Sequence, residues 1–265
     1  MSHLFPVVVV GSGNMGAALA RCLRLANPEA VILGVDPDRS RLELLESEGV
    51  LTPAPPDWSL QQGILVLAIK PQVLETVAAA LKPRLGKDVL VVSILAGVPL
   101  QRLRAAMGTD RVVRTMPNLP LTVGAGATAI ATDGCSPEVL TLVKSLLAPT
   151  GEVVEVLESQ LDAVTGLSGS GPAYVLKFLM ALEDGGVFSG LPRNVARKLA
   201  IATMSGTLRM ILESGEEPDV LRGQVTSPGG TTIYGLHALE QGGFAASVMG
   251  AVQAATLRSK ELGKG

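Results

Sequence analysis

The chain has 265 residues and a formal net charge of −2, with 47% hydrophobic, 17% charged and 3% aromatic residues. This length suits one large or two modest domains, and the charge offers no basic surface for nucleic acid. Two cysteines and two histidines argue against a disulfide framework or a metal site, and no apolar run is long enough for a membrane span, so we expect a cytoplasmic protein.

The segment Val7–Ala20 joins a run of four valines to a G-x-G-x-x-G motif and an alanine-rich stretch. The valines predict a buried parallel strand, and the alanine-rich stretch predicts a helix. In this motif Gly11 permits a tight turn, Gly13 lets a pyrophosphate approach the backbone, and Gly16 allows close helix–strand packing. We therefore favour a dinucleotide-binding unit over a purely structural turn, with the pyrophosphate at the helix N-terminus.

A second strand is predicted at Val31–Val35, and Asp36 follows it directly. A carboxylate at this position is typical of binding to the adenosine ribose. Asp36 equally suits the N-cap of a helix that begins at Pro37, and the two roles are compatible. Arg39 and Arg41 fall in the first turn of that helix, where they can offset the negative charge.

The proline-containing segment Thr52–Gln62 predicts a loop. Further strands are expected at Gly63–Ala68, Val89–Val92, Arg111–Arg114, Gly126–Ala131 and Glu152–Val156, most of them separated by helices. This alternation specifies a mostly parallel, doubly wound α/β sheet, whose ligands bind at the carboxyl ends of the strands. Ala68–Gln72 and Met116–Asn118 both fall at those ends, although Lys70 alone would fit a solvated helix start equally well.

Strands disappear after Glu158, and the remaining chain predicts helices only. They are expected at Gln160–Leu167, Pro172–Asp184, Pro192–Glu213, Thr231–Gln241 and Phe244–Glu261. Gly185 and Gly215 should follow helix ends, and Ser168 and Ser170 should cap the next helix. These patterns predict a dinucleotide-binding domain at residues 1–157 and an all-helical domain at residues 158–265.

The helical segment Ala173–Leu182 is apolar nearly all round. Such a helix must be enclosed on every side, and the helical part of this chain is too small to enclose it alone. We therefore expect an intertwined dimer built through this domain.

A turn of small residues, Val225–Thr232, opens the helix that carries His237. Its backbone N–H groups at a positive helix end suit a small carboxylate, although a plain glycine-containing helix start also fits the turn when it is considered alone. Five residues at about 100° each place His237 roughly 140° from Thr232 around the helix axis. We therefore expect His237 to face elsewhere, as a surface histidine.

Several motifs together resemble the pyrroline-5-carboxylate reductase family. They are, in chain order, Gly11–Gly16, Ala68–Gln72, Met116–Asn118, Gly166–Tyr174 and Val225–Thr232. The resemblance implies a Rossmann-type α/β domain followed by an all-α dimerisation domain. It also implies reduction of the cyclic imino acid 1-pyrroline-5-carboxylate to L-proline by hydride from NADPH or NADH, in a homodimer that can assemble further.

The resemblance assigns roles to individual residues. The expected cofactor-binding residues are Gly11, Ser12, Gly13, Asn14, Met15, Gly16, Asp36, Arg39, Ala68, Ile69, Lys70, Pro71 and Asn118. The substrate would lie on the turn that contains Ser227, Gly229, Gly230, Thr231 and Thr232. The Thr232 hydroxyl would bond the ring nitrogen and is the expected catalytic group.

Two residues depart from the family pattern. Many members have Asn or Ser followed by Arg after the second strand, which suits a 2′-phosphate. Asp36 would repel that phosphate but bond a free 2′-hydroxyl. Tyr234 replaces a residue that is usually smaller, near the substrate.

Two other functions compete with the reductase. A β-hydroxyacid-type dehydrogenase would need a catalytic lysine in the helical domain, and the candidates Lys177 and Lys198 lie outside that family's motif. A dinucleotide-binding redox sensor would bind NADH without turning it over.

Overall fold

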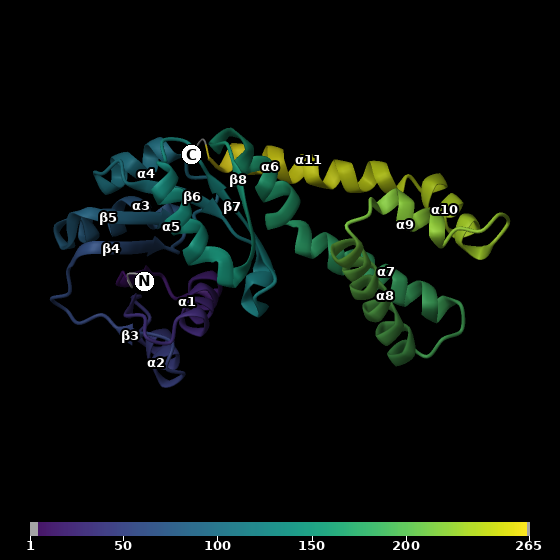
Figure 1. The fold of residues 1–265 in the computed structure, drawn as a ribbon, viewed down its shortest axis with the longest axis horizontal. Helices are drawn as coiled ribbons and strands as arrows, with labels where there is room; N and C mark the ends of the chain where they lie inside the picture. The colour runs from purple at the N-terminus through teal and green to yellow at the C-terminus, as the bar shows by residue number, and fades with distance from the viewer. Residues whose placement is uncertain (1–4, 264–265) are drawn as a thin grey trace. The chain divides into compact units, whose positions relative to one another are not determined.

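The computed structural model describes residues 5–263. The chain divides into two compact units, which we call the first unit (residues up to 170 together with those from 254 onward) and the second unit (residues 171–253). Figure 1 traces the chain through both units. Within the described residues, no helix is both long enough and apolar enough to cross a membrane.

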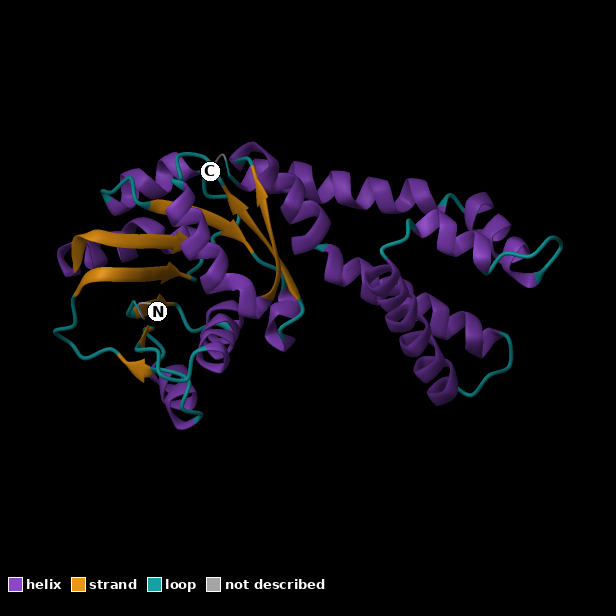
Figure 2. Cartoon of the chain, viewed as in Figure 1, coloured by secondary structure: helices purple, strands orange, loops and turns teal. Residues whose placement is uncertain are grey.

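The first unit is built on an eight-stranded sheet with helices against it (Figure 2). Its strands are β1 (Val7–Val10), β2 (Ile32–Val35), β3 (Thr52–Pro53), β4 (Leu60–Leu67), β5 (Leu85–Ser93), β6 (Val112–Met116), β7 (Gly126–Ala131) and β8 (Gly151–Val156). Their order is β3-β2-β1-β4-β5-β6-β7-β8, and every neighbouring pair is parallel except β6 and β7. The predicted doubly wound, mostly parallel sheet is confirmed.

Helices cover both faces of this sheet. They are α1 (Asn14–Ala26), α2 (Arg39–Ser47), α3 (Leu74–Leu81), α4 (Leu100–Met107) and α5 (Pro137–Leu147). Val7 and Val9 join a buried cluster with α1, α2 and α5, whereas Val8 and Val10 join a second cluster with α3 and α4. Successive side chains of a strand point to opposite faces, so β1 is buried on both sides, which explains its unbroken valine run.

The strand order reverses at β1, which has β2 on one side and β4 on the other. Doubly wound sheets bind ligands at the carboxyl ends of the strands beside such a reversal. At that end the Ala68 N–H donates to the Val10 carbonyl oxygen at 2.8 Å. Gly11 has φ +98°, and a Cβ there would lie 2.4 Å from the Ala68 carbonyl oxygen. Both the conformation and the crowding require glycine.

The loop predicted for Thr52–Gln62 is wrong in part, because this segment contains β3 and the first residues of β4. β3 lies at the edge of the sheet, where a proline such as Pro53 is tolerated. Trp58 is buried, and the guanidinium of Arg84 lies 5.4 Å from the centre of its ring. Trp58 and Leu60 of this segment therefore belong to the core, whereas most of its other residues are exposed.

Short helical segments connect β8 to the next long helix. A short helix, α6 (Leu161–Val164), is followed by a π-helical turn at Thr165–Gly169. The Ser168 hydroxyl donates to the Val164 carbonyl oxygen, and Ser170 has helical backbone angles. The predicted capping by these two serines is wrong, because an N-cap needs a non-helical backbone ahead of free N–H groups.

The second unit contains only helices. They are α7 (Gly171–Phe188), α8 (Arg193–Ser214), α9 (Pro218–Gln224), α10 (Thr231–Gln241) and the first half of α11 (Phe244–Leu262). α9 was not predicted. Gly215 caps α8 with φ +68°, as expected. The end predicted at Gly185 is wrong: α7 continues through Gly186, where a Cβ would lie 3.0 Å from the Ala196 Cβ of α8. The glycine therefore permits close packing of α7 on α8.

An ion pair fastens α7 to α8. The Glu183 carboxylate, which is buried, accepts hydrogen bonds from Arg197 at 2.9 Å and from Arg193 at 2.8 Å. These bonds, that from Arg197 first, hold the pKa of Glu183 below its ordinary value. The carboxylate stays charged, and this polar contact holds α7 and α8 together.

Much of the apolar surface of α7 is exposed within a single chain. Val175, Leu176 and Met180 are 51%, 56% and 57% exposed, and Phe188 is 95% exposed. Much of the apolar surface of α7 is therefore left uncovered by the described part of its own chain, although the sequence predicts that this helix is enclosed.

Candidate functional sites

A cavity of about 720 Å³ lies in the first unit at the carboxyl ends of β1 and β4. Its walls come from the glycine-rich turn, α1, α2 and the segment after β4. The lining residues are Ser12, Gly13, Asn14, Met15, Ala17, Ala18, Arg21, Arg41, Leu44, Leu45, Ala68, Ile69, Lys70, Leu119 and Thr122. Two stretches far apart in the sequence that were predicted to bind a dinucleotide thus share one cavity.

The glycine-rich turn has the features of a phosphate cradle. α1 begins after Gly13, which has no side chain to cap the N–H groups of the first turn. The Ser12 hydroxyl is buried and has no hydrogen-bond partner within residues 5–263. A Cβ at Gly13 would meet only the tip of Arg41, 4.0 Å away, so the backbone here is open to a ligand. An uncapped helix end, an unpaired hydroxyl and an open backbone together fit the pyrophosphate of a dinucleotide.

Gly16 has a purely structural task in this cradle. A Cβ at this position would lie 2.0 Å from the Gly11 carbonyl oxygen and 3.0 Å from the Ala68 Cβ. No side chain fits there, so the third glycine of the motif allows α1 to pack on the turn before it.

Asp36 is bonded to the glycine-rich turn. One of its carboxylate oxygens accepts the Ser12 N–H at 2.6 Å, and the other accepts the Asp38 N–H at 2.8 Å. The N-cap of α2 is Asp38, which accepts the Ser40 N–H, so the interpretation of Asp36 as that cap is wrong. Asp36 instead fixes the end of β2 against the turn that would hold the pyrophosphate.

Several predicted cofactor residues lie outside the lining of the cavity. Gly11 and Gly16 lie where the backbone packs tightly against its neighbours, and Asp36 is hydrogen-bonded to the backbone of the turn. Arg39 is exposed and pairs with Glu43 at 3.0 Å. Pro71 begins a short 3₁₀-helix after Lys70. The Asn118 amide donates to the Ser168 carbonyl oxygen and accepts the Ala127 N–H, so both ends of this amide have partners within the first unit.

In the second unit, the predicted substrate turn leads into α10. The Gly230 N–H donates to the Ser227 carbonyl oxygen at 3.1 Å, and Gly229 has φ +68°. Gly230 is the N-cap of α10 and has no side chain to cap the N–H groups of the first turn. Thr232 is half-buried in that turn. An uncapped positive helix end preceded by small residues suits the carboxylate of a small ligand.

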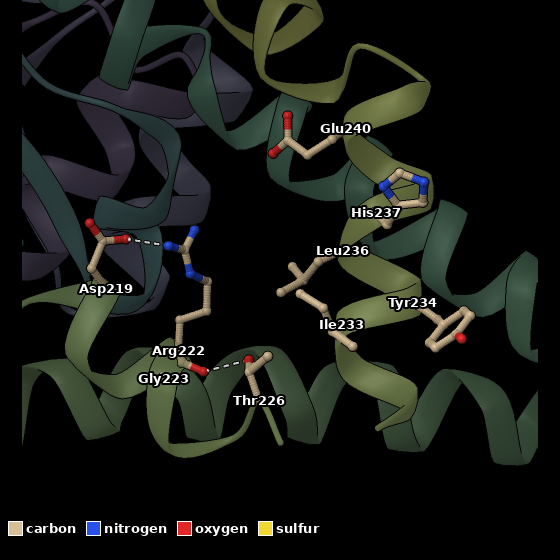
Figure 3. Close-up of a pocket in the computed structure, with 9 residues that line it drawn as sticks. All are labelled: Asp219, Arg222, Gly223, Thr226, Ile233, Tyr234, Leu236, His237 and Glu240. Carbon is tan, nitrogen blue, oxygen red and sulfur yellow. Dashed lines mark hydrogen bonds and ion pairs between the residues drawn. The ribbon is translucent and has the colours of Figure 1, made fainter. Parts of the chain in front are cut away.

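A separate cavity of about 710 Å³ lies between α9 and α10 (Figure 3). Its lining residues are Asp219, Arg222, Gly223, Thr226, Ile233, Tyr234, Leu236, His237 and Glu240. Arg222 pairs with Asp219 at 3.2 Å. His237 lines this cavity, whereas Thr232 is not among its lining residues. α9 was not predicted from the sequence, because this helix has only seven residues. Its cavity-lining residues Asp219, Arg222 and Gly223 nevertheless recur at helical spacing after Pro218.

No group of three or more His, Cys, Asp or Glu within the described part of the chain is arranged to hold a metal ion.

Comparisons with known proteins agree along nearly the whole chain. The family model described as pyrroline-5-carboxylate reductase dimerisation matches residues 158–262, and the model described as NADP oxidoreductase, coenzyme F420-dependent, matches residues 6–97. The pyrroline-5-carboxylate reductase of a Synechocystis strain is 45% identical over 262 residues, which are 97% of each chain. That of Arabidopsis thaliana is 39% identical over 263 residues, covering 97% of this chain and 95% of its own.

Solved structures give the same result. A pyrroline-5-carboxylate reductase from Coxiella burnetii superposes with a TM-score of 0.89 at 31% identity, covering 98% of this chain and 99% of that one. The Plasmodium falciparum enzyme, solved with NADP bound, superposes with a TM-score of 0.85 at 30% identity, covering 98% of each chain.

Proposed function

The chain belongs to the pyrroline-5-carboxylate reductase family, and on that premise we propose how its own residues perform the reaction. It is an NAD(P)H-dependent oxidoreductase that reduces 1-pyrroline-5-carboxylate to L-proline, the last step of proline biosynthesis. NADH or NADPH, when bound, supplies the hydride.

The cofactor is assigned to the cavity of the first unit. The buried, unpaired Ser12 hydroxyl and the open backbone at Gly13 support this assignment, because they offer bonding groups to a pyrophosphate. Asp36 is assigned to the adenosine side of the cofactor. Arg39, which was predicted with it, pairs with Glu43 on the exposed side of α2 and is assigned no contact. Ala68, Ile69, Lys70, Pro71 and Asn118 are assigned to the nicotinamide side.

The substrate carboxylate is assigned to the turn Ser227–Thr232. The single observation that carries this assignment is the uncapped N-terminus of α10, whose free N–H groups and positive dipole attract a carboxylate. The Thr232 hydroxyl, which can donate and accept, then orients the ring nitrogen. No His, Asp or Glu lies within this turn, so we propose that the substrate arrives as an iminium or takes its proton through water.

We assign nucleotide binding to residues 1–157 and substrate binding with dimerisation to residues 158–265. The dimerisation model that begins at residue 158 supports this boundary. Cys22 and Cys135 are unpaired, which suits a reducing cytoplasm, and we propose that location for the enzyme.

We predict a homodimer, able to assemble further, because α7 exposes apolar side chains that its own chain leaves uncovered. Light scattering at micromolar concentration should give at least twice the mass of one chain. A Met180→Glu variant should shift toward monomer, whereas Leu25→Glu, on an 81% exposed residue of α1, should leave the mass unchanged. A stable, well-folded wild-type monomer would contradict the dimer.

The reaction itself is tested by mixing the purified chain with 1-pyrroline-5-carboxylate and NADH or NADPH. We expect oxidation of the cofactor with stoichiometric formation of L-proline, and no reduction of NAD⁺ with β-hydroxyacids. Turnover of hydroxyacids instead would favour the dehydrogenase alternative. Tight NADH binding with neither turnover would identify a redox sensor.

A further inference from the structure

Two arginines follow β2, and the structure gives them different surroundings. Arg39 lies on the exposed side of α2, where 88% of its side chain is accessible and Glu43 pairs with it. Arg41 lines the cavity of the first unit, and its guanidinium lies closest to the open side of Gly13. Of these two residues, Arg41 is the one placed to meet a ligand that lies on the glycine-rich turn.

Arg41 is already engaged by a carboxylate. Its Nε lies 3.0 Å from an oxygen of Asp38, and the other oxygen of Asp38 accepts the Ser40 hydroxyl at 2.6 Å. Asp38 is therefore held at the start of α2, and it neutralises the charge that Arg41 would offer. The other arginine that lines the cavity, Arg21, forms two hydrogen bonds with Glu48 and is neutralised in the same way.

Asp36 adds a second fixed negative charge at the same strand end. Its two oxygens each accept one backbone N–H, from Ser12 and from Asp38, and these bonds hold the carboxylate in position. A carboxylate has about four acceptor sites, so each oxygen keeps room for a ribose hydroxyl. A 2′-phosphate brings only acceptors and about two negative charges, which Asp36 repels.

We propose that Asp36 and Asp38 together make this chain prefer NADH, and that Arg41 is the residue through which it accepts the 2′-phosphate of NADPH. The inference rests on the proposed placement of the cofactor in the first-unit cavity. Asp38 holds the Nε of Arg41, and its negative charge offsets the charge that Arg41 offers to a phosphate. The Asp38–Arg41 pair therefore opposes NADPH while having no effect on the free 2′-hydroxyl of NADH.

The test measures dissociation constants of NADH and NADPH by calorimetric titration in the absence of substrate. We expect the wild-type chain to bind NADH at least about tenfold more tightly than NADPH. Asp36→Ser should shift the ratio toward NADPH by about tenfold or more, since it removes the fixed charge. Asp38→Asn keeps a side chain that caps α2 and frees Arg41, so NADPH binding should tighten.

Arg41→Ala should weaken NADPH binding by about tenfold or more and change NADH binding by less than about twofold. The matched control is Arg102→Ala, which also removes an arginine paired with a carboxylate, Glu75, but lies outside the cavity. It should leave both constants unchanged.

Tighter binding of NADPH than NADH by the wild-type chain would overturn the proposal. So would a loss of NADPH binding in Arg39→Ala that Arg41→Ala does not share. Because these constants need no turnover, they are independent of the reaction. A chain that binds both cofactors as expected yet leaves 1-pyrroline-5-carboxylate unreduced would contradict the proposed function alone.

Discussion

Gly13→Ala is expected to weaken NADH binding by about 100-fold while leaving the melting temperature unchanged. A methyl group at Gly13 meets only the tip of Arg41 at 4.0 Å, so the free protein accommodates it. The same methyl group covers the backbone that a pyrophosphate must approach. Loss of two charge-assisted hydrogen bonds at about 1.5 kcal/mol each gives a change of this size. Titration and thermal unfolding measure the two effects separately.

Gly16→Ala provides the contrast. Here the added Cβ would lie 2.0 Å from the Gly11 carbonyl oxygen, so the backbone must move even without a ligand. Overpacking of this kind costs about 1–3 kcal/mol, and the melting temperature should fall. If Gly13→Ala binds NADH as well as the wild type, the pyrophosphate does not lie on this turn.

The second large effect is expected at Thr232. A hydrogen bond to a charged group is worth about 1.5–3 kcal/mol, which is roughly 10- to 150-fold in rate when it is lost in the transition state. Thr232→Val and Thr232→Ala should therefore lower kcat/KM for 1-pyrroline-5-carboxylate by about that factor. Binding of NADH should not change, because Thr232 is assigned to the substrate.

Two further variants locate the effect in the hydroxyl group. Thr232→Ser keeps the hydroxyl and should keep most of the activity. His237→Ala should cost much less than Thr232→Ala, because His237 lines the cavity toward α9 and Thr232 does not. If His237→Ala is the more damaged variant, the histidine rather than the threonine serves the ring nitrogen.

Features set by local sequence were predicted well. The strand at the valine run, the turn at the glycine motif and the first residue of α10 each depend on residues within a few positions in the chain. Thr231 opens α10 as expected, because glycines precede it and an unbroken helical pattern follows. The position of the cavity beside β1 and β4 was predictable for a related reason: the carboxyl ends of neighbouring parallel strands must meet at one edge of a sheet.

The errors arose where distant partners decide the structure. Gly185 was predicted to follow a helix end, yet α7 continues past it, and the adjacent Gly186 allows α8 to approach α7. Pro53 is accepted in a strand only because β3 lies at the sheet edge. Arg39 and Arg41 are two positions apart on α2, so they lie about 200° apart around the helix axis. The sequence does not say which of the two faces the cavity, and the structure shows that it is Arg41.

The account depends most on the turn before α10, and a crystal structure of the chain with bound L-proline tests it directly. We expect the proline carboxylate on the N–H groups of Thr231 and Thr232, with the ring nitrogen within hydrogen-bond distance of the Thr232 hydroxyl. Proline bound instead in the cavity beside Arg222 and His237, with the turn empty, would contradict the assignment of Thr232.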